Sequence, residues 1–198
     1  MARRGDALRE HILVVAKDVF LESGFDRASM DVVAARAETS KRSLYAHFES
    51  KDKLFAAVVT LAREMYLDKL KTPADYDGDV TLYCARFLQL LLREPALRTC
   101  RMGIAEAERL PEASAGYYDA IFATSHDRLT TFLVENRALT PESAGETATE
   151  LLGLTVHPRL FRALLGVEKP LPVTADLTTL TTDIDLTPIR AAVDRALG

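Results

Sequence analysis

Apolar residues recur every three or four positions through the first seventy residues of this 198-residue chain, and later segments repeat the pattern. Such spacing places apolar side chains on one face of a helix, because an α-helix has about 3.6 residues per turn. No run of alternating apolar and polar residues lies between turn signals, as it would in a half-buried strand. The sequence therefore predicts an all-α fold.

Three serines divide the N-terminal part into short helices. Ser29, Ser40 and Ser50 each precede an apolar stripe, and a serine hydroxyl at such a position accepts a hydrogen bond from a free backbone N–H of the first turn. Gly24 supplies the left-handed residue that commonly ends a helix. The predicted helices cover about 6 to 23, 30 to 37, 41 to 47, and a stretch from 51 that ends before Pro73.

Prolines and turn residues divide the remaining chain. The Pro, Asp and Gly content of residues 72 to 78 predicts a loop that changes the helix direction. Pro158 is expected to kink or break a long helix, because its ring cannot donate the helical hydrogen bond. Residues 167 to 186 have weak periodicity. The predicted helices cover about 79 to 93, 95 to 109, 112 to 138, a stretch from Pro141 onward, and 187 to 196.

Composition limits the function classes. The 25 Lys and Arg against 29 Asp and Glu give a net charge of −4, which as a sum argues against nucleic-acid binding. The 48% hydrophobic content is typical of a globular protein with a core. No apolar run approaches the roughly 20 residues of a membrane-spanning helix, and the N-terminus leads into no apolar signal region. The sequence therefore predicts a cytoplasmic protein with no membrane partner.

The sequence offers no pattern typical of catalysis or metal binding. Cys84 and Cys100 lie among apolar residues, where a free cysteine most often acts as a small hydrophobic side chain. Oxidant sensing by these thiols is the less favoured alternative. The histidines at 11, 47, 126 and 157 show no metal-ligand spacing. We therefore expect no enzyme activity, no metal and no cofactor.

The short helix at 41 to 47 is the segment most suited to binding a ligand. Two short helices joined by a tight turn form the helix-turn-helix geometry, whose second helix can enter the major groove of DNA. Arg and Lys can bond guanine there, while hydroxyl and imidazole groups suit phosphate oxygens. The alternative is ordinary helix packing with a solvated polar face. The outward side chains are hydrogen-bond donors with no carboxylate among them: Ser40, Lys41, Arg42, Ser43, Tyr45 and His47.

Two strings of residues closely resemble the DNA-binding domain of TetR-family transcriptional regulators. The first covers 16–34 and includes a Gly-Phe pair, and the second covers 40–54 with the letters SKRSLYAHFESKDKL. Further along, residues 101–112 resemble the AefR-like subgroup of the family's C-terminal domains. The resemblance implies an N-terminal three-helix helix-turn-helix DNA-binding domain over 1–53. A helical effector-binding and dimerisation domain would follow over 54–198.

The resemblance also implies roles for individual residues. Lys41 and Arg42 would contact bases or adjacent phosphates, and Lys51 would close the clamp on the phosphate backbone. Ser29 would cap its helix and touch phosphate. The remaining side chains that would hold the phosphate backbone are Ser43, Tyr45 and His47.

Two features of the N-terminal part leave the DNA contacts open. Arg3 and Arg4 form either a basic arm or a disordered, solvated terminus. Glu38 stands in the turn where the family usually has glycine. A non-glycine residue forced to positive φ costs on the order of 1 kcal/mol, and a carboxylate near DNA repels it. We expect Glu38 to alter the turn or to lower the DNA affinity.

A homodimer on an inverted-repeat operator follows from the same resemblance, because two recognition helices about 34 to 36 Å apart reach successive major grooves. A strip of small residues, Ala144, Gly145, Ala148 and Gly153, suits the dimer interface or, alternatively, helix packing within one subunit. Aromatic and apolar side chains of the C-terminal helices are expected to line an effector pocket. The candidates are Met65, Phe87, Met102, Tyr117, Tyr118, Phe122 and His126.

The sequence thus predicts a ligand-responsive regulator, foremost a repressor, with double-stranded DNA and a small-molecule effector as partners. The alternative is a small-molecule sequestering protein whose helix-turn-helix is weakened by Glu38. Residues 1–53 hold 10 basic and 9 acidic side chains, a net charge of +1, whereas residues 54–198 hold 15 and 20, a net charge of −5. The local placement of donors from Ser40 to Lys51, rather than total charge, must therefore carry DNA binding.

Overall fold

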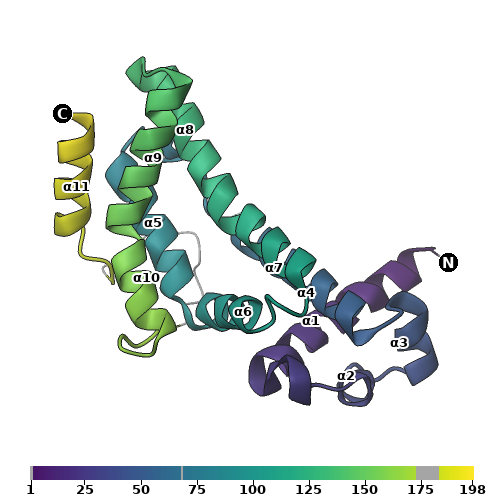
Figure 1. Ribbon diagram of the computed structural model, residues 1–198. Coiled ribbons are helices and arrows are strands. Elements are labelled where there is room, and N and C mark those ends of the chain that lie inside the picture. Colours follow the sequence, from purple (N-terminus) through teal and green to yellow (C-terminus); the bar gives the residue numbers. More distant parts are fainter. Residues whose placement is uncertain (1, 68, 173–182) are drawn as a thin grey trace. The chain divides into compact units, whose positions relative to one another are not determined.

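The computed structural model describes residues 2–67, 69–172 and 183–198; the side chains of residues 2–4, 63, 66 and 67 fall outside the description. Within these ranges the chain is helical without a strand, apart from a β-bridge between Arg93 and Leu171, which confirms the all-α fold (Figure 1). No helix among them has the length and apolar character needed to cross a membrane. The helices are α1 (Ala2–Arg27), α2 (Met30–Arg36), α3 (Lys41–His47), α4 (Lys51–Leu67), α5 (Val80–Leu92), α6 (Glu94–Ala105), α7 (Pro111–Tyr118), α8 (Thr124–Arg137), α9 (Pro141–Thr155), α10 (His157–Leu164) and α11 (Thr187–Leu197).

The residues pack into two compact units. The first unit joins Met1–Glu64 to Arg98–Tyr117, and the second joins Met65–Leu97 to Tyr118–Gly198. Most of α6 and α7 therefore belongs to the same unit as α1, α2 and α3, although these helices are far apart in the sequence. The expected boundary between residues 53 and 54 divides the chain by function, and the two compact units divide it by packing. The functional boundary therefore stays a prediction.

The three predicted serine caps begin helices of the first unit. The Oγ atoms of Ser29, Ser40 and Ser50 accept hydrogen bonds from backbone N–H groups three residues on, at 3.2, 3.0 and 3.1 Å. These caps confirm the predicted starts of α2, α3 and α4. Helix α3 has only seven residues, and the fully buried Leu44 docks it onto its neighbours. A helix this short is marginal in water without such packing.

Helix α1 turns at Gly24, where the sequence predicts its end, and then continues to Arg27. Gly24 has φ 75° and ψ 168°, a conformation essentially restricted to glycine. After this turn Phe25 packs against Phe20 and Phe55, with ring centroids 5.7 and 5.1 Å away. The three rings are at most 2% exposed. They form the aromatic core of the first unit.

The segment 112–138 is helical as predicted up to Arg137, but the helix changes type in its middle, which the sequence did not predict. Residues Asp119–Ala123 form a π-helical turn that separates α7 from α8. The Thr124 hydroxyl donates to the Asp119 carbonyl at 3.0 Å, and the Ser125 hydroxyl donates to the Ile121 carbonyl at 2.6 Å. The hydroxyl of Tyr83, on α5, donates to the Ser125 carbonyl at 2.8 Å. These bonds favour the widened turn, because hydroxyl donors compete with the backbone for helix carbonyls.

Prolines set two further boundaries. Helix α9 ends at Thr155 and α10 begins at His157, so the predicted break at Pro158 is confirmed. The predicted loop over 72–78 contains a short 3-10 helix, Pro73–Tyr76. Of the weakly periodic segment 167–186, residues 173–182 lie outside the described ranges.

Candidate functional site

The turn between α2 and α3 holds a non-glycine residue in the left-handed conformation. Glu38 has φ 49°, the positive φ at which a non-glycine residue is expected to be strained, and its side chain is exposed. The Thr39 N–H donates to the Ala34 carbonyl at 3.0 Å and closes the turn. A carboxylate is therefore held in solvent next to the start of α3.

All eight predicted DNA-binding residues belong to the first unit. Helix α3 presents hydrogen-bond donors outward, while Leu44 and Phe48 anchor its other side in the core. Tyr45 is 48% exposed, although it is a large aromatic side chain. Contact of these residues with DNA stays a prediction. The exposed members are Ser40, Lys41, Arg42 and Tyr45, and the half-buried members are Ser29, Ser43, His47 and Lys51.

Lys41 has an acidic partner on the preceding helix. Its Nζ lies 2.6 Å from Asp31 Oδ1, and the two side chains are 62% and 61% exposed. Water screens such a pair, so its contribution to stability is small. Lys41 can bind a phosphate only after its ion pair with Asp31 is broken. Arg42 is therefore better suited than Lys41 to contact a base.

Lys51, at the start of α4, belongs to a cation–aromatic cluster with Phe25 and Arg109. Its Nζ lies 4.3 Å from the centre of the Phe25 ring and donates to the Asp26 carbonyl at 3.1 Å. The Arg109 guanidinium lies 4.1 Å from the same ring and donates to the Asp52 carboxylate at 3.0 Å. Arg109 thus neutralises the acidic neighbour of Lys51 and positions the start of α4.

Sequence reasoning missed Arg109. It is 57 positions away from Asp52 in the chain, so no local pattern connects the two. The only signal was the resemblance of residues 101–112 to a family segment. The backbone of Arg3 and Arg4 belongs to α1, and their side chains lie outside the description, so a basic arm and a solvated terminus both stay open for them.

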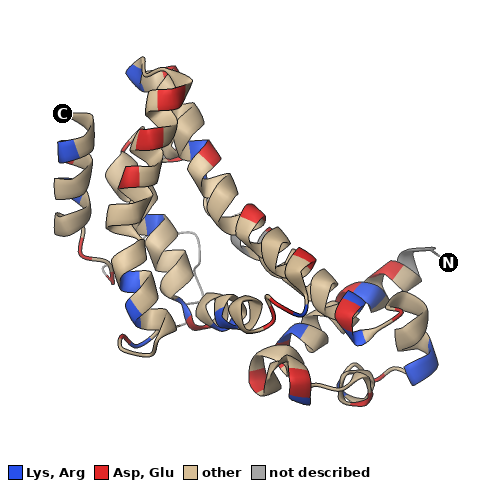
Figure 2. Cartoon of the chain, in the orientation of Figure 1, with Lys and Arg blue, Asp and Glu red and all other residues tan. Residues whose placement is uncertain are grey.

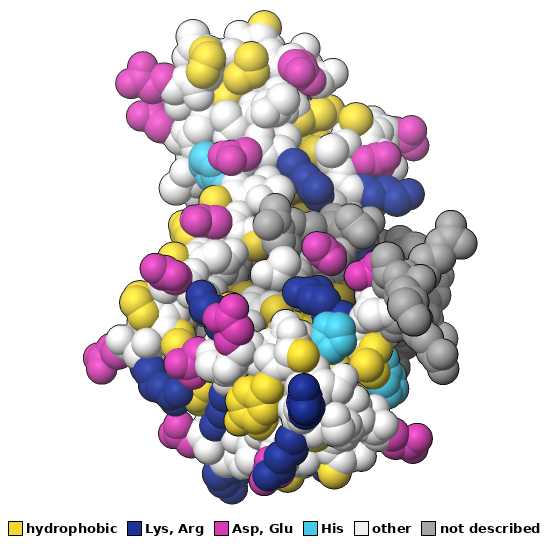
Figure 3. Space-filling model, turned by 90° about the vertical axis from the view of Figure 1, so that its right-hand side faces the viewer, with side chains coloured by type: hydrophobic (Ala, Val, Ile, Leu, Met, Phe, Trp, Pro, Cys, Tyr) yellow, Lys and Arg dark blue, Asp and Glu magenta, His cyan; other side chains and the backbone are white. Residues whose placement is uncertain are grey.

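Charge alone does not mark a binding surface on this chain. Lys and Arg are interspersed with Asp and Glu along α1 to α4 (Figure 2), and the face in Figure 3 carries both signs. This agrees with the net charge of only +1 over residues 1–53. The donors of α3 distinguish this segment from the rest of the unit.

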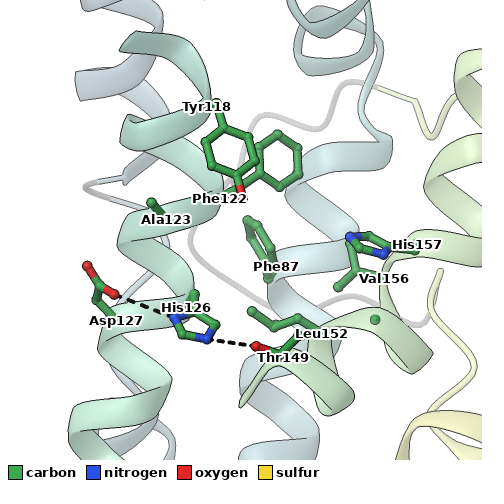
Figure 4. Close-up of a pocket in the computed structure, with 11 residues that line it drawn as sticks. Phe87, Tyr118, Phe122, Ala123, His126, Asp127, Thr149, Leu152, Val156 and His157 are labelled. Atoms are coloured by element: carbon green, nitrogen blue, oxygen red, sulfur yellow. Dashed lines mark hydrogen bonds and ion pairs between the residues drawn. The ribbon is translucent and has the colours of Figure 1, made fainter. Parts of the chain in front are cut away.

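The second unit contains a cavity of about 290 Å³ (Figure 4). The rings of Tyr118 and Phe122 stack with centroids 5.7 Å apart and planes at 24°. Phe87 meets Phe122 edge-on at 6.1 Å. At the polar end, His126 Nε2 lies 3.1 Å from Thr149 Oγ1. The described lining comprises Phe87, Tyr118, Phe122, Ala123, His126, Asp127, Thr149, Leu152, Gly153, Val156 and His157.

Four of the predicted ligand-binding residues line this cavity: Phe87, Tyr118, Phe122 and His126. Met65, also in the second unit, is 40% exposed and is not among its described lining residues. Met102 and Tyr117 belong to the first unit, where Met102 lines a separate cavity of about 410 Å³. The structure therefore brings together part of the predicted set.

Helix α9 contributes lining residues that the sequence analysis missed. Thr149, Leu152 and Gly153 lie on one side of α9, and the C-cap residue Val156 continues their spacing i, i+3, i+4, i+7. The spacing indicates that these residues share one helix face, but most such faces pack against a protein core rather than a ligand. Ala123, Asp127 and His157 carried no signal of their own.

The small-residue strip on α9 packs within the chain. Ala144 and Ala148 have 0% exposure, and Gly153 lines the cavity. Packing within one subunit, the alternative considered for this strip, is therefore the arrangement found for the two alanines. Large apolar side chains are instead exposed near the end of α9, along α10 and just after it. Leu154, Phe161, Leu165 and Val167 are 47%, 57%, 78% and 62% exposed.

Both cysteines are buried. Burial raises the pKa of the Cys84 thiol to about 12, against a lowering hydrogen bond with Thr155. Burial likewise raises the pKa of the Cys100 thiol to about 11, against a lowering hydrogen bond with Tyr117. The thiolate is the reactive form, so these environments disfavour oxidant sensing.

Two family models match the chain. Residues 12–58 match the model described as bacterial regulatory proteins, tetR family. Residues 80–185 match the model described as AefR-like transcriptional repressor, C-terminal domain. The second match covers more than half of the chain.

Individual relatives match over shorter stretches. A 62-residue segment is 44% identical to the HTH-type transcriptional activator FasR of Mycolicibacterium smegmatis and covers 29% of this chain and 28% of FasR. A 127-residue segment is 31% identical to the DNA-binding transcriptional repressor TetR of Mycobacteroides abscessus and covers 64% of this chain and 57% of that protein. The chain thus spans from about a quarter to little more than half of these relatives.

A crystal structure of a TetR-family transcriptional regulator from Mesorhizobium loti has the same fold. It superimposes with a TM-score of 0.77 over 98% of this chain and 95% of that chain, at 21% sequence identity. At this identity the likeness concerns the arrangement of helices and not the ligand.

Proposed function

This chain belongs to the TetR family of bacterial regulatory proteins, and from that premise we propose that it is a ligand-responsive DNA-binding transcriptional regulator of the cytoplasm. A homodimer binds an inverted-repeat operator, and a small-molecule effector releases it. The proposal rests on α3, a seven-residue helix docked by Leu44 with donors outward. Residues 1–53 serve DNA binding, and residues 54–198 serve effector binding and dimerisation. The protein acts by binding and not by catalysis.

The DNA contacts are assigned by side-chain chemistry. Arg42 is exposed on α3, and its guanidinium can bond guanine O6 and N7 together. Lys51 adds a cation at the N-terminus of the 17-residue α4, where free backbone N–H groups also attract phosphate. On DNA binding, the ion pair between Lys41 and Asp31 breaks, and Lys41 contacts a phosphate or a base instead. The hydroxyl and imidazole groups of Ser29, Ser40, Ser43, Tyr45 and His47 donate to phosphate oxygens.

Fluorescence anisotropy with DNA fragments from the region upstream of its own gene tests this assignment. Tyr45→Ala and Lys51→Ala should each weaken binding to all fragments about tenfold, and Lys51→Ala, which removes a cation, should also flatten the salt dependence. Arg42→Ala should change the preferred sequence. Arg137→Ala removes an exposed arginine from α8 in the second unit, and this control should bind as the wild type does. Unchanged DNA affinity in the first three variants contradicts the proposal.

We assign the dimer interface to the exposed apolar side chains of α9 and α10. One recognition helix contacts too few bases, so an operator of useful specificity requires two. Large apolar side chains gathered on a surface commonly mark an association site, and Phe161 on α10 lies four residues before Leu165, the C-cap of that helix. Phe161→Glu with Leu165→Glu should give a monomer by light scattering and weaken operator binding more than tenfold. A persistent dimer refutes this surface.

The 290 Å³ cavity is the proposed effector site. An effector releases DNA only if it binds one of two protein states more tightly. Helix α4 is the proposed lever, because it begins at Lys51 and continues to the second unit at Met65. We propose that the protein represses transcription rather than activates it. The family model that matches the longer segment is described as a repressor, whereas FasR, which matches a shorter segment, is described as an activator. A thermal-shift screen, with hits retested for release of DNA, tests the coupling.

Glu38 favours one alternative function. Its carboxylate lies in solvent beside α3 and repels phosphate, as it would in a small-molecule sequestering protein that no longer binds DNA. A gel-shift assay separates the two functions. A protein that binds ligand but retains no upstream fragment, even after Glu38→Gln, is the sequestering protein.

A further inference from the structure

The polar end of the cavity fixes the position of a proton on His126. Its Nε2 lies 3.1 Å from the Gly145 carbonyl oxygen and 3.1 Å from Thr149 Oγ1. A carbonyl oxygen only accepts hydrogen bonds, so Nε2 carries a hydrogen. The Thr149 hydroxyl donates to the same carbonyl at 2.9 Å, so it is also an acceptor toward Nε2. In the neutral imidazole Nδ1 is therefore an acceptor.

The second ring nitrogen meets another acceptor. Nδ1 of His126 lies 3.5 Å from Asp127 Oδ1, as the dashed line in Figure 4 shows. An ionised carboxylate only accepts hydrogen bonds, so a neutral His126 and Asp127 together present two acceptors and no donor. A ligand hydroxyl placed here would donate to one of them. A carboxylate ligand would meet like charge from Asp127.

The remaining wall suits a flat, uncharged molecule. Among the described lining residues none is Lys or Arg, so an anionic ligand finds no permanent positive charge there. The stacked rings of Tyr118 and Phe122 and the edge of Phe87 form an aromatic wall, which favours another ring in offset or edge-to-face contact. The volume of about 290 Å³ lies at the lower end for small-molecule sites, which suits one or two fused rings.

We propose that the effector is an uncharged hydroxyarene of one or two rings, whose ring stacks on the Tyr118–Phe122 wall and whose hydroxyl donates to the His126–Asp127 acceptor pair. This inference rests on the proposed function, because it takes the cavity to be the effector site. Thr149 acts as a positioning residue, since it holds the Nε2 side of His126 and leaves Nδ1 for the ligand.

Three naphthalenes test the acceptor pair. 2-Naphthol carries a hydroxyl donor, 2-methoxynaphthalene lacks the donor, and 2-naphthoate is an anion at neutral pH. The chain contains no Trp, so the fluorescence of each probe reports binding to the 198-residue chain against little protein background. 2-Naphthol should bind about tenfold more tightly than the ether, because an unmet hydrogen bond in a cavity costs affinity of this size. 2-Naphthoate should bind most weakly.

Two variants separate the roles of the polar and aromatic ends. His126→Leu should bind 2-naphthol and the ether with Kd values within twofold of each other. Phe122→Ala should weaken both probes alike and keep the preference for the hydroxyl. His11→Leu, which changes an exposed histidine of α1 in the first unit, is the matched control and should bind as the wild type does.

Outcomes of this experiment distinguish the inference from the function on which it rests. Equal affinity of the wild type for 2-naphthol and its ether, an unchanged preference in His126→Leu, tighter binding of 2-naphthoate, or no binding of any probe overturns the inference. Operator binding, measured in parallel without probe, is unaffected by such a result. Hydroxyl-selective binding by a protein that retains no operator fragment supports the acceptor pair and overturns the regulatory function instead.

Discussion

Seven of the eight proposed DNA-binding residues lie within the twelve positions from Ser40 to Lys51, whereas the cavity lining is drawn from residues 87 to 157. The first set is arranged by one short helix, its N-cap and the start of the next helix. The second set is arranged by the packing of α5, α8, α9 and α10 and by the π-helical turn before α8. A local set depends on its own sequence, and a dispersed set depends on the whole unit. Substitutions in the two regions should therefore fail in different ways.

The largest expected effect tests how independent the two regions are. Phe25→Ala removes a ring that is 2% exposed, packs on Phe20 and Phe55 and carries Lys51 and Arg109 on its surface. We expect a loss of about 3 to 5 kcal/mol of unfolding free energy and loss of DNA binding. Urea unfolding followed by circular dichroism, at one protein concentration, measures the stability.

Phe161→Ala is the matched control in the second unit, because this phenylalanine is 57% exposed. Its effect on stability should stay within about 0.5 kcal/mol under conditions where the protein is monomeric. The cavity should still bind 2-naphthol in Phe25→Ala at temperatures where the second unit stays folded. Loss of probe binding in step with the first unit would show that the two regions unfold as one.

A smaller effect is expected at the α2–α3 turn, where strain and charge can be separated. Glu38→Gly relieves the left-handed conformation and should stabilise the protein by up to about 1 kcal/mol, because glycine accepts positive φ without steric cost. Glu38→Ala keeps the strain and should not stabilise. Both variants remove the carboxylate and should tighten DNA binding by a similar factor. Equal stability of the two variants would mean that the turn is unstrained.

The fold was predictable from sequence where its determinants are local. Ser29, Ser40 and Ser50 cap helices at the predicted positions, since an N-cap needs only a hydroxyl and the backbone three residues on. The helix break at Pro158 follows from the proline ring alone, because this ring leaves no backbone N–H to donate the helical hydrogen bond. The π-helical turn at Asp119–Ala123 was missed, because it also depends on a hydrogen bond from Tyr83, 42 positions away from Ser125.

The candidate sites follow the same division. The donors of α3 could be predicted as a set because one helix orients them all. For the cavity, the sequence identified aromatic residues but could not tell Phe122, which lines it, from Met102, which belongs to the other unit. Both have apolar side chains on helices, and only the packing of helices far apart in the chain distinguishes them. Arg109 was missed for the same reason.

A still smaller effect is expected for the ion pair that positions α4. A double-mutant cycle of Arg109→Ala and Asp52→Ala should give a coupling energy of roughly 0.5 to 1 kcal/mol, because Arg109 is 47% exposed and water screens the pair. Arg109→Lys should recover less than half of it, since a lysine lacks the planar group that stacks on Phe25. Thermal and urea unfolding of the four proteins measure the coupling.

The Arg36–Glu22 pair provides the control cycle. These side chains are 2.6 Å apart and 49% and 55% exposed, so the control resembles the test pair in geometry and solvation. Its coupling should be smaller than that of Arg109 and Asp52, because the Phe25 ring holds the Arg109 guanidinium in place. Equal coupling in both cycles would reduce Arg109 to an ordinary surface residue.

The smallest expected effect is a difference in reactivity between the two thiols. Cys100 lies in the first unit and Cys84 lies in the second. Burial raises the pKa of Cys100 to about 11 and that of Cys84 to about 12, so both stay protonated at neutral pH. A disulfide reagent at pH 7.5 should modify the native protein far more slowly than the urea-unfolded chain. As the pH rises toward 10, Cys100 should react before Cys84, and single Cys→Ala variants identify each thiol. Rapid modification of native protein at pH 7.5 would restore oxidant sensing as a function. Earlier reaction of Cys84 would mean that the second unit opens more readily than the first, the reverse of the order that the two burial environments favour.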